Sequence, residues 1–493
     1  MVYEHGCVLE KVPVIGRYSV LLPRTILNFI YAFKSQQIIE RGYQEFKDRT
    51  CQFIRIDGQM LLLPLNLLEE LSSIPNHIAS RNKALEHDLL GRYTGISLIL
   101  DSRLHHTIIQ RKLTPRLEQV APVLEGELAG LFEEYLPASS DRWTIFQPHH
   151  VFAKISSRLS ARMLVGPELC RNEEWLEVSV KFTESLFTSV AILRFLPPCI
   201  RSFVGPLLPS YWQSRNYLRI AKGLLSPVFE KLLEEHDTGK WELDNTNEAN
   251  LNMIAWLVDS AKGADRDAST LAHIEVLLAL ASVHTTLQRL ISTLYDLTAN
   301  PSYIEDILQE IGEVQSSGWS ISSYAKLRKM DSILRESQRM SPPTIVGMKR
   351  IFQAPYTFTT GFHVPAGAHV CLPTFAIEND PAVTPSPEIF DGLRSYRKRL
   401  ASKVSSHGKD QEHIFTTPEK TMLGFGFGKT ACPGRFFADV VLKMVCVKMF
   451  QEYEFKFMEA QSRPKNFVLH DWIFTRPWDT MMVRKKNNGF GSF

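Results

Sequence analysis

TMLGFGFGKTACPGRFFA, residues Thr421–Ala438, sets three glycines at alternate positions ahead of a single cysteine, Cys432. Glycines at this density let the backbone turn tightly and approach a bulky, flat partner. Residues Arg435–Phe450 contain neither glycine nor proline, which predicts a helix that begins just after the cysteine. A helix N-terminus favours a thiolate, and a buried thiolate needs a partner such as a metal ion. The stretch therefore predicts a metal-binding cysteine, with a buried structural cysteine beside a turn as the alternative.

The spacing of this loop, Phe425-x-x-Gly428-x-x-x-Cys432-x-Gly434, resembles the haem-binding signature of the cytochrome P450 superfamily. The resemblance implies haem b as the cofactor and the Cys432 thiolate as the axial ligand of its iron. It also implies that Phe425, Gly426 and Gly434 belong to the cofactor-binding loop. The implied fold is mainly α with small β-sheets, a single-domain P450 fold that holds the haem between a long central helix and the cysteine loop.

Length and composition agree with one large globular protein. The chain of 493 residues has a net charge of +3 and is 44% hydrophobic, which suits a sizeable core and argues against a nucleic-acid surface. Its seven cysteines show no CxxC pair and no zinc spacing, as in proteins of a reducing compartment. Because no repeat or low-complexity linker divides the chain, we expect one haem-thiolate monooxygenase domain over residues 18–493.

The N-terminal part has no apolar span of ~18 residues or more, the length that a transmembrane helix needs. The nearest candidate, Tyr18–Phe33, is broken by Pro23, so we expect neither a membrane span nor a secretory signal in the chain as given. By resemblance, residues 1–17 are a hinge remnant, and the protein lies at the cytosolic face of the endoplasmic reticulum membrane, with possible peripheral contact. The apolar, proline-broken stretch 191–209 is then a mobile lid that dips into the membrane surface, or alternatively a buried core turn.

A long central helix is predicted over Asp267–Asn300, which contains no glycine or proline and would span about 50 Å. Asp267 or Ser269 is expected to cap its N-terminus. Polar residues interrupt its apolar centre, where Thr285 follows one turn after the small Ala281. This spacing predicts a notch with a hydroxyl at its lip, since a threonine can bond the carbonyl four residues back.

The notch resembles the oxygen-activation motif of the P450 superfamily. In that motif Thr285 matches the catalytic alcohol, and His284 stands where the family has an acid. A histidine titrates near neutral pH, so we expect His284 to help Thr285 deliver protons to dioxygen. The alternative is that His284 is a helix histidine with its hydrogen bonds satisfied and no catalytic role.

Two further parts of the resemblance concern the frame of the site. Glu336 and Arg339 lie three apart on one helix face, and with Arg394 they match the family's buried ionic triad, to which we assign a structural role. The substrate pocket over the haem is expected to include four residues from the central helix, the strand after the triad helix and the C-terminal segment, namely Ala281, Ile345, Val346 and Phe474.

The expected contacts to the haem propionates depart from the family pattern. Thr430 stands where the family has an arginine or histidine, and His106 and Gln110, counted back from the following proline, replace its W-x-x-x-R pair. Both could still hydrogen-bond a propionate, although a solvated helix face is the alternative. Lys349 and Arg350, on a later strand, are further candidates, and Arg350 is the one we favour.

The resemblance also implies partners. Electrons would come from NADPH through NADPH-cytochrome P450 reductase, docked on a basic face, although scattered surface cations are the alternative. The expected basic residues are Lys429, Arg435, Lys443, Lys448 and Arg116. No nucleic-acid partner is expected, and the substrate is an apolar small molecule.

Short strings at residues 89–95, 110–115 and 284–286 resemble filamentous-fungal biosynthetic members that oxidise terpenoids. The resemblance implies a monooxygenase that hydroxylates, or oxidises in several steps, a diterpene, indole-diterpene or meroterpenoid. A haem-thiolate isomerase or non-oxygenating haem protein is the alternative, and retention of Thr285 argues against it. A non-haem iron site at His273 and Glu275 is set aside, because residues two apart on a helix point to nearly opposite faces.

Overall fold

The computed structural model describes residues 12–16, 22–404 and 412–487, and it is mainly helical with small sheets, as the resemblance implied. The helices are α1 Arg24–Glu45, α2 Leu68–Ser73, α3 Arg81–Asp88, α4 Gly91–Thr94, α5 Leu98–Asp101, α6 Leu104–Ile108, α7 Leu117–Tyr135, α8 Pro148–Leu164, α9 Gly166–Leu169, α10 Glu173–Leu193, α11 Pro198–Val204, α12 Pro209–Asp237, α13 Met253–Ser260, α14 Ala268–Ala299, α15 Ser302–Ser316, α16 Ser323–Lys326, α17 Arg328–Met340, α18 Thr374–Glu378, α19 Arg394–Val404 and α20 Arg435–Glu452. Most of the predicted N-terminal hinge, residues 1–11 and 17, lies outside the described residues.

Four small sheets accompany the helices in the described residues. The largest has six strands in the order β1-β2-β3-β9-β6-β4, and the hairpin that turns at Asp57 and Gly58 supplies its β2 and β3. A second sheet has the order β10-β13-β5, and two antiparallel pairs complete the set. The strands are β1 Val14–Ile15, β2 Cys51–Arg55, β3 Gly58–Leu62, β4 Ala79–Ser80, β5 Thr144–Phe146, β6 Gly347–Phe352, β7 Tyr356–Thr357, β8 His363–Val364, β9 His369–Leu372, β10 Tyr453–Phe457, β11 Phe467–Leu469, β12 Trp472–Phe474 and β13 Met481–Lys485.

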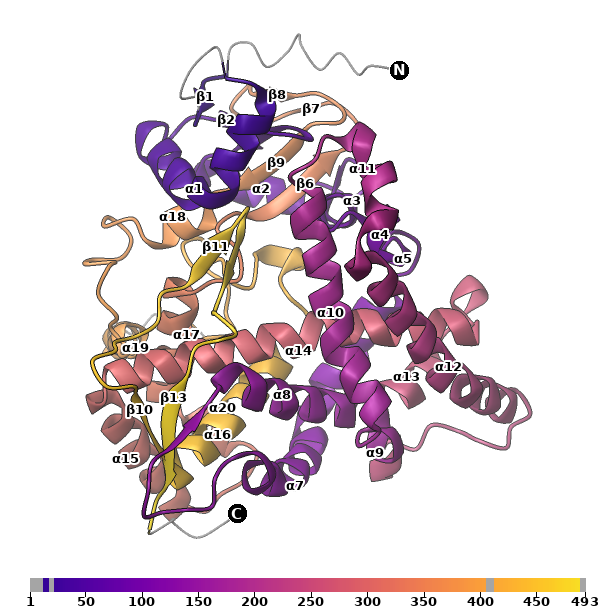
Figure 1. Cartoon of the computed structure of the whole chain (residues 1–493), viewed down its shortest axis with the longest axis vertical. Helices are drawn as coiled ribbons and strands as arrows, with labels where there is room; N and C mark the ends of the chain where they lie inside the picture. The colour runs from indigo at the N-terminus through magenta and orange to yellow at the C-terminus, as the bar shows by residue number, and fades with distance from the viewer. Residues whose placement is uncertain (1–11, 17–21, 405–411, 488–493) are drawn as a thin grey trace.

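The central helix α14 runs across the middle of the molecule, with the six-stranded sheet and α1 on one side and α7, α8 and α20 on the other (Figure 1). Its bounds confirm the predicted helix to within one residue at each end. The Asp267 side chain caps it by accepting a hydrogen bond from the backbone N–H of Thr270 at 2.8 Å. Of the two expected caps, Asp267 is therefore the one used.

Helix α14 belongs to the protein core. Within the described part of the chain it alone is long and apolar enough to cross a membrane, but 61% of its most apolar window is buried inside the protein. Residues such as Leu271, Ile274 and Leu290 are fully enclosed by neighbouring helices in the main hydrophobic cluster. Its hydropathy is thus explained by core packing.

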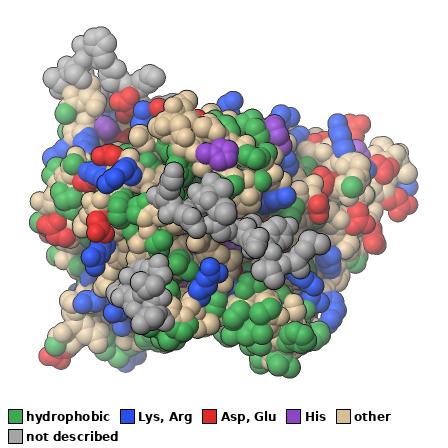
Figure 2. All heavy atoms as spheres, turned by 90° about the horizontal axis from the view of Figure 1, so that it is seen from above, with side chains coloured by type: hydrophobic (Ala, Val, Ile, Leu, Met, Phe, Trp, Pro, Cys, Tyr) green, Lys and Arg blue, Asp and Glu red, His purple; other side chains and the backbone are tan. Residues whose placement is uncertain are grey.

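The segment 191–209 is mostly helical, with a short turn at residues 194–197 between α10 and α11. Pro198 occupies the first turn of α11, where its missing N–H costs nothing, so the proline starts a helix instead of breaking one. Phe203 and Leu207 are each 77% exposed, which contradicts the alternative of a buried core turn. Figure 2, seen from above, shows hydrophobic side chains gathered at the lower right edge of this face.

Candidate active site

The cysteine loop folds as its glycines predict. Gly426 and Gly428 have φ of +78° and +60°, a region that side-chain-bearing residues rarely adopt. The turn brings the backbone N–H of Cys432 to within 2.7 Å of the Phe425 carbonyl oxygen, to which it donates. Gly434 is the N-cap of α20, so the cysteine directly precedes a helix N-terminus.

The Cys432 side chain faces a cavity between this loop and α14. Burial raises the pKa of the thiol, while the N–H groups of Gly434 and Arg435 and nearby arginine charges lower it less. The N–H groups at the helix N-terminus favour the thiolate, as expected, but burial has the larger effect. Deprotonation at this position needs a stronger partner, and a metal ion supplies one.

Opposite Cys432, the notch in α14 has the predicted geometry. The Thr285 hydroxyl donates to the Ala281 carbonyl oxygen at 2.8 Å, and both residues line the cavity. The hydroxyl also lies 3.3 Å from the Ser282 carbonyl oxygen. A side-chain hydroxyl is thus held at the cavity wall, with its oxygen lone pairs available to a second partner.

His284 also lines the cavity, and its Nε2 lies 3.0 Å from the Val180 carbonyl oxygen of α10. Because a carbonyl only accepts hydrogen bonds, Nε2 carries the proton and Nδ1 is the basic nitrogen. Burial lowers the pKa of His284, so the ring is neutral near pH 7. Its catalytic role stays a prediction, since this hydrogen bond also suits a structural histidine.

Two arginines lie beside the cysteine loop without a carboxylate partner among the described residues. Arg350 donates to the Thr430 hydroxyl at 3.0 Å, and Arg81 donates to the Thr430 carbonyl oxygen at 2.8 Å. Both line the cavity. Burial lowers the pKa of Arg350 to about 10, with the charge of Arg81 adding to the effect. Two unneutralised cations beside the thiol, Arg350 buried and Arg81 half-buried, suit a ligand that carries two carboxylates.

The expectation for His106 and Gln110 needs correction. Gln110 is exposed, and neither residue lines the cavity, whereas His105 does. The reason is local: residues Ile109–Leu113 form a π-helical turn, which acts as a one-residue insertion and shifts the register of the preceding helix. Counting back from Pro115 with α-helical spacing therefore selected His106. The residue that faces the cavity is its neighbour, His105.

The structure brings the ionic triad together. Arg339 donates to the two carboxylate oxygens of Glu336 at 2.7 and 3.0 Å, and Arg394 lies 3.3 Å from Glu336. The Glu336 and Arg339 side chains are almost fully buried. Such a paired and hydrogen-bonded charge set holds α17 to the start of α19, away from the residues of the cavity.

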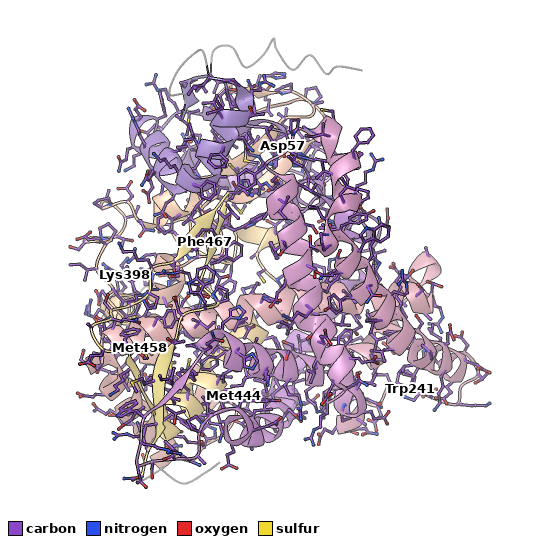
Figure 3. All side chains as sticks on the ribbon, in the orientation of Figure 1. Asp57, Trp241, Lys398, Met444, Met458 and Phe467 are labelled. Carbon is purple, nitrogen blue, oxygen red and sulfur yellow. The ribbon has the colours of Figure 1, made fainter. Side chains whose placement is uncertain are left out.

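The cavity has a volume of about 1550 Å³ and is bounded by α14, α10, β6 and the β11–β12 hairpin. Ala281, Val346 and Phe474 line it as expected. Ile345 does not line it; it packs into the cluster under the N-terminal sheet, to which Val346 also belongs. Phe467, labelled on β11 in Figure 3, belongs to the same wall as Phe474.

Three predicted cations are not where sequence reasoning put them. Lys349 lies in a buried ionic cluster, 2.8 Å from Asp471, whereas Arg350 and Arg81 are the residues that donate to Thr430 of the cysteine loop. Lys443 and Lys448 are also buried and paired with carboxylates on or near α20, which removes them from any docking face. Of the remaining predicted docking residues, Lys429 is exposed and Arg435 and Arg116 are partly buried.

These groups fit a haem. The Cys432 thiol faces the cavity, two arginines without a carboxylate partner among the described residues stand beside it, and a threonine notch lines the same cavity. Sequence reasoning missed Arg81, whose signal was its place at the first position of a helix after a short strand. Cys432, Phe425 and Gly426 line the cavity, and Gly434 sets the start of α20.

Comparisons with known proteins point the same way. The family model described as Cytochrome P450 matches residues 82–482. The chain is 34% identical to cytochrome P450 monooxygenase AN1598 of Emericella nidulans and 31% identical to an ent-kaurene oxidase of Gibberella intermedia, and each match covers 97% of this chain and 88% of the relative.

A solved structure has the same fold. The retinoic-acid-bound cyanobacterial CYP120A1 superimposes with a TM-score of 0.67 over 96% of this chain and 99% of that chain, at 18% identity. The fungal relatives, which also include cytochrome P450 monooxygenase AtmP of Aspergillus flavus, confirm the predicted resemblance to fungal members of the superfamily. The chain belongs to the cytochrome P450 family and is a P450 monooxygenase, with haem b as cofactor and electrons from NADPH supplied through a reductase.

Proposed function

We propose that this monooxygenase hydroxylates, or oxidises in successive steps, a terpenoid secondary metabolite of the diterpene, indole-diterpene or meroterpenoid class. The observation that carries the proposal is the large, mostly apolar cavity that opens between Cys432 and Thr285. Leu277, Leu280 and Val346 give it walls that suit a polycyclic hydrocarbon body. Relatives that include an ent-kaurene oxidase support this substrate class.

In the proposed mechanism the protein's own residues bind the haem, orient the substrate and supply protons. Cys432 would supply the sulfur ligand, and Arg81 and Arg350 would hold the propionates. Bound haem would supply the oxygen activation and the hydrogen abstraction from the substrate. The Thr285 hydroxyl donates to Ala281 at rest, and it would pass a proton by turning this O–H into the cavity while its Oγ1 takes up a replacement proton.

We further propose that His284 resupplies this proton. Its basic Nδ1 is neutral near pH 7 and can pick up a proton from water, while its Nε2–H stays on the Val180 carbonyl. The apolar walls exclude bulk water from the substrate and so limit the loss of protons and electrons to side reactions. A haem-thiolate isomerase would need neither the Thr285 hydroxyl nor a proton path.

The likeness to the relatives also supports a location at the cytosolic face of the endoplasmic reticulum membrane. Phe203 and Leu207 near α11 are strongly exposed, as are Phe29 and Phe33 on α1. Phe195 joins the two elements, with its ring 5.8 Å from Phe29 and 5.9 Å from Phe33. An aromatic group of this kind suits peripheral contact with a bilayer surface. NADPH-cytochrome P450 reductase is the proposed electron donor.

The test uses the haem-loaded enzyme with reductase and NADPH. A panel with one diterpene hydrocarbon, one indole-diterpene and one meroterpenoid is screened for a substrate-induced spin shift, and products are then identified by mass. The proposal expects at least one member to bind and to gain oxygen in proportion to the NADPH used. Rearranged product without NADPH would instead indicate an isomerase.

A further inference from the structure

A cluster of buried charges adjoins the cavity, where the β2–β3 turn, α3, β6, the end of α10, α11 and the β11–β12 turn meet. Figure 3 labels one member, Asp57, in the upper part of the molecule. Side chains of six members are only 0–6% exposed, and that of Lys349 is 17% exposed. The members are the cations Arg55, Arg194, Arg201 and Lys349 and the carboxylates Asp57, Asp88 and Asp471.

Every carboxylate in the cluster is already shared by two or more cations. Asp88 lies 2.5 Å from Lys349 and 3.2 Å from Arg55. Asp471 lies 2.8 Å from Lys349 and 3.2 Å from Arg194, and it accepts a further hydrogen bond from the Tyr31 hydroxyl at 2.6 Å. No oxygen of these carboxylates is left over to neutralise another cation.

The charges of the cluster do not balance. Four cations against three carboxylates leave one positive charge in a region shielded from water. Burial lowers the pKa of His369 to about 3, so its ring is neutral and does not change this charge count. An excess buried charge is costly unless a ligand of opposite charge compensates it.

Lys349 is the member that can reach such a ligand. An ammonium has three donors, and two of them are directed at Asp88 and Asp471. Lys349 lines the cavity, as do the apolar residues Leu85, Leu89 and Val346 and the charged residues Asp88 and Arg350. One charged donor of Lys349 thus remains for a ligand that enters the cavity.

A metal ion does not fit the same place. Potential ligand atoms of His87, Asp88 and His369 lie within 4.8 Å of one another. Asp88, however, is already held by Arg55 and Lys349, and the excess charge of the cluster is positive. A cation would meet net repulsion here, whereas an anion would be attracted.

We propose that Lys349 anchors a carboxylate of the substrate, so that this enzyme binds terpenoids that already carry an acid group. The inference rests on the proposed function, because it takes the cavity to be the terpenoid site. A carboxylate on Lys349 would neutralise the cluster and fix the polar end of the substrate. The apolar body would then lie along the cavity, and specificity would come from the distance between the acid group and the oxidised carbon.

The test compares abietic, dehydroabietic and pimaric acids with their methyl esters and their primary alcohols, by calorimetric titration of the haem-loaded enzyme at a pH where the acids are ionised. We expect each acid to bind about tenfold tighter or more than its neutral counterparts. Equal or weaker binding of the acids by the wild-type enzyme would overturn the proposal, without any variant.

Variants sharpen the comparison. Lys349→Met should remove the preference for the acids, and Lys349→Arg should keep most of it because the charge stays. Lys443→Met is the matched control: it also removes a buried lysine between two aspartates, but one that does not line the cavity, so the preference should persist. The carbonyl spectrum checks that each variant is folded. If the preference persists in Lys349→Met or is lost in Lys443→Met, the anchor is refuted.

The outcome can be separated from that of the proposed function. Turnover of the alcohols to oxidised products, together with equal affinities for acids and alcohols, would overturn the anchor and leave the terpenoid oxidation standing. A clear preference for the acids without any oxidised product would uphold the anchor and count against the proposed oxidation.

Discussion

Replacing Arg350 with methionine should have opposite effects on the haem-free and haem-loaded protein. Arg350 is almost fully buried, and desolvation, together with the charge of Arg81, lowers its pKa to about 10. A lowering of this size corresponds to roughly 3 kcal/mol, by which the haem-free fold disfavours this charge. A propionate would offset that cost, so we infer that Arg350 destabilises the empty protein and stabilises the loaded one.

The assay measures both states. Arg350→Met should raise, or at least not lower, the melting temperature of the haem-free protein, and it should speed haem transfer to an apoglobin scavenger by about tenfold or more. Arg397→Met, at an exposed arginine paired with Asp391, is the control and should change neither quantity much. Slower or unchanged haem loss in Arg350→Met, with a less stable haem-free protein, would refute the assignment of Arg350 to a propionate.

Three further predictions concern other parts of the site. Thr285→Ala should lower product formed per NADPH while haem content stays the same, and an unchanged ratio of product to NADPH would show that the hydroxyl carries no proton. Glu336→Gln leaves two buried arginines short of a negative charge, so it should cost about 3–5 kcal/mol and lower the yield of folded, haem-loaded protein; a stability within error of wild type would exclude a role for the triad. Burial raises the pKa of Glu378 from 4.5 to about 7, so wild-type stability should fall between pH 5 and 7 by up to about 3 kcal/mol. Glu378→Gln should flatten that dependence in thermal melts, and parallel curves would refute it.

The sign of the last effect follows from proton binding. In the folded state Glu378 is enclosed, and its carboxylate accepts one backbone hydrogen bond, from Leu423 next to the cysteine loop. Desolvation still outweighs that bond, so the folded state holds the proton more tightly than the unfolded state does. Stability is therefore greatest below the unfolded pKa and is lost as pH rises through the folded pKa.

Features set by neighbouring residues could be predicted from the sequence. The bounds of α14, its Asp267 cap and the bond from Thr285 to Ala281 depend on a few adjacent positions. The β2–β3 hairpin likewise follows from the Asp57–Gly58 pair and the alternation around it. The cysteine loop was recognisable because several special residues must occur together at fixed spacing. The extent of the single domain, residues 18–493, stays a prediction.

Features set by tertiary packing could not be predicted from the sequence. Lys443 and Lys448 were expected on the surface because lysine is rarely buried, but carboxylates from other turns and helices enclose them. Ile345 and Val346 could not be told apart without knowing which face of the extended segment meets the cavity. Arg81 and Arg350 are far apart in the chain, and each donates a hydrogen bond to Thr430. Only the fold shows that both lie beside this residue.

The central claim is that Cys432 is the axial ligand of the haem iron, and the carbonyl complex of the reduced protein tests it most directly. Wild-type protein should give the red-shifted Soret band of a thiolate ligand. Cys432→Ser should lose that band, whereas Cys446→Ser, a buried cysteine on α20 that does not line the cavity, should retain it. An unchanged thiolate-type spectrum in Cys432→Ser would contradict the account.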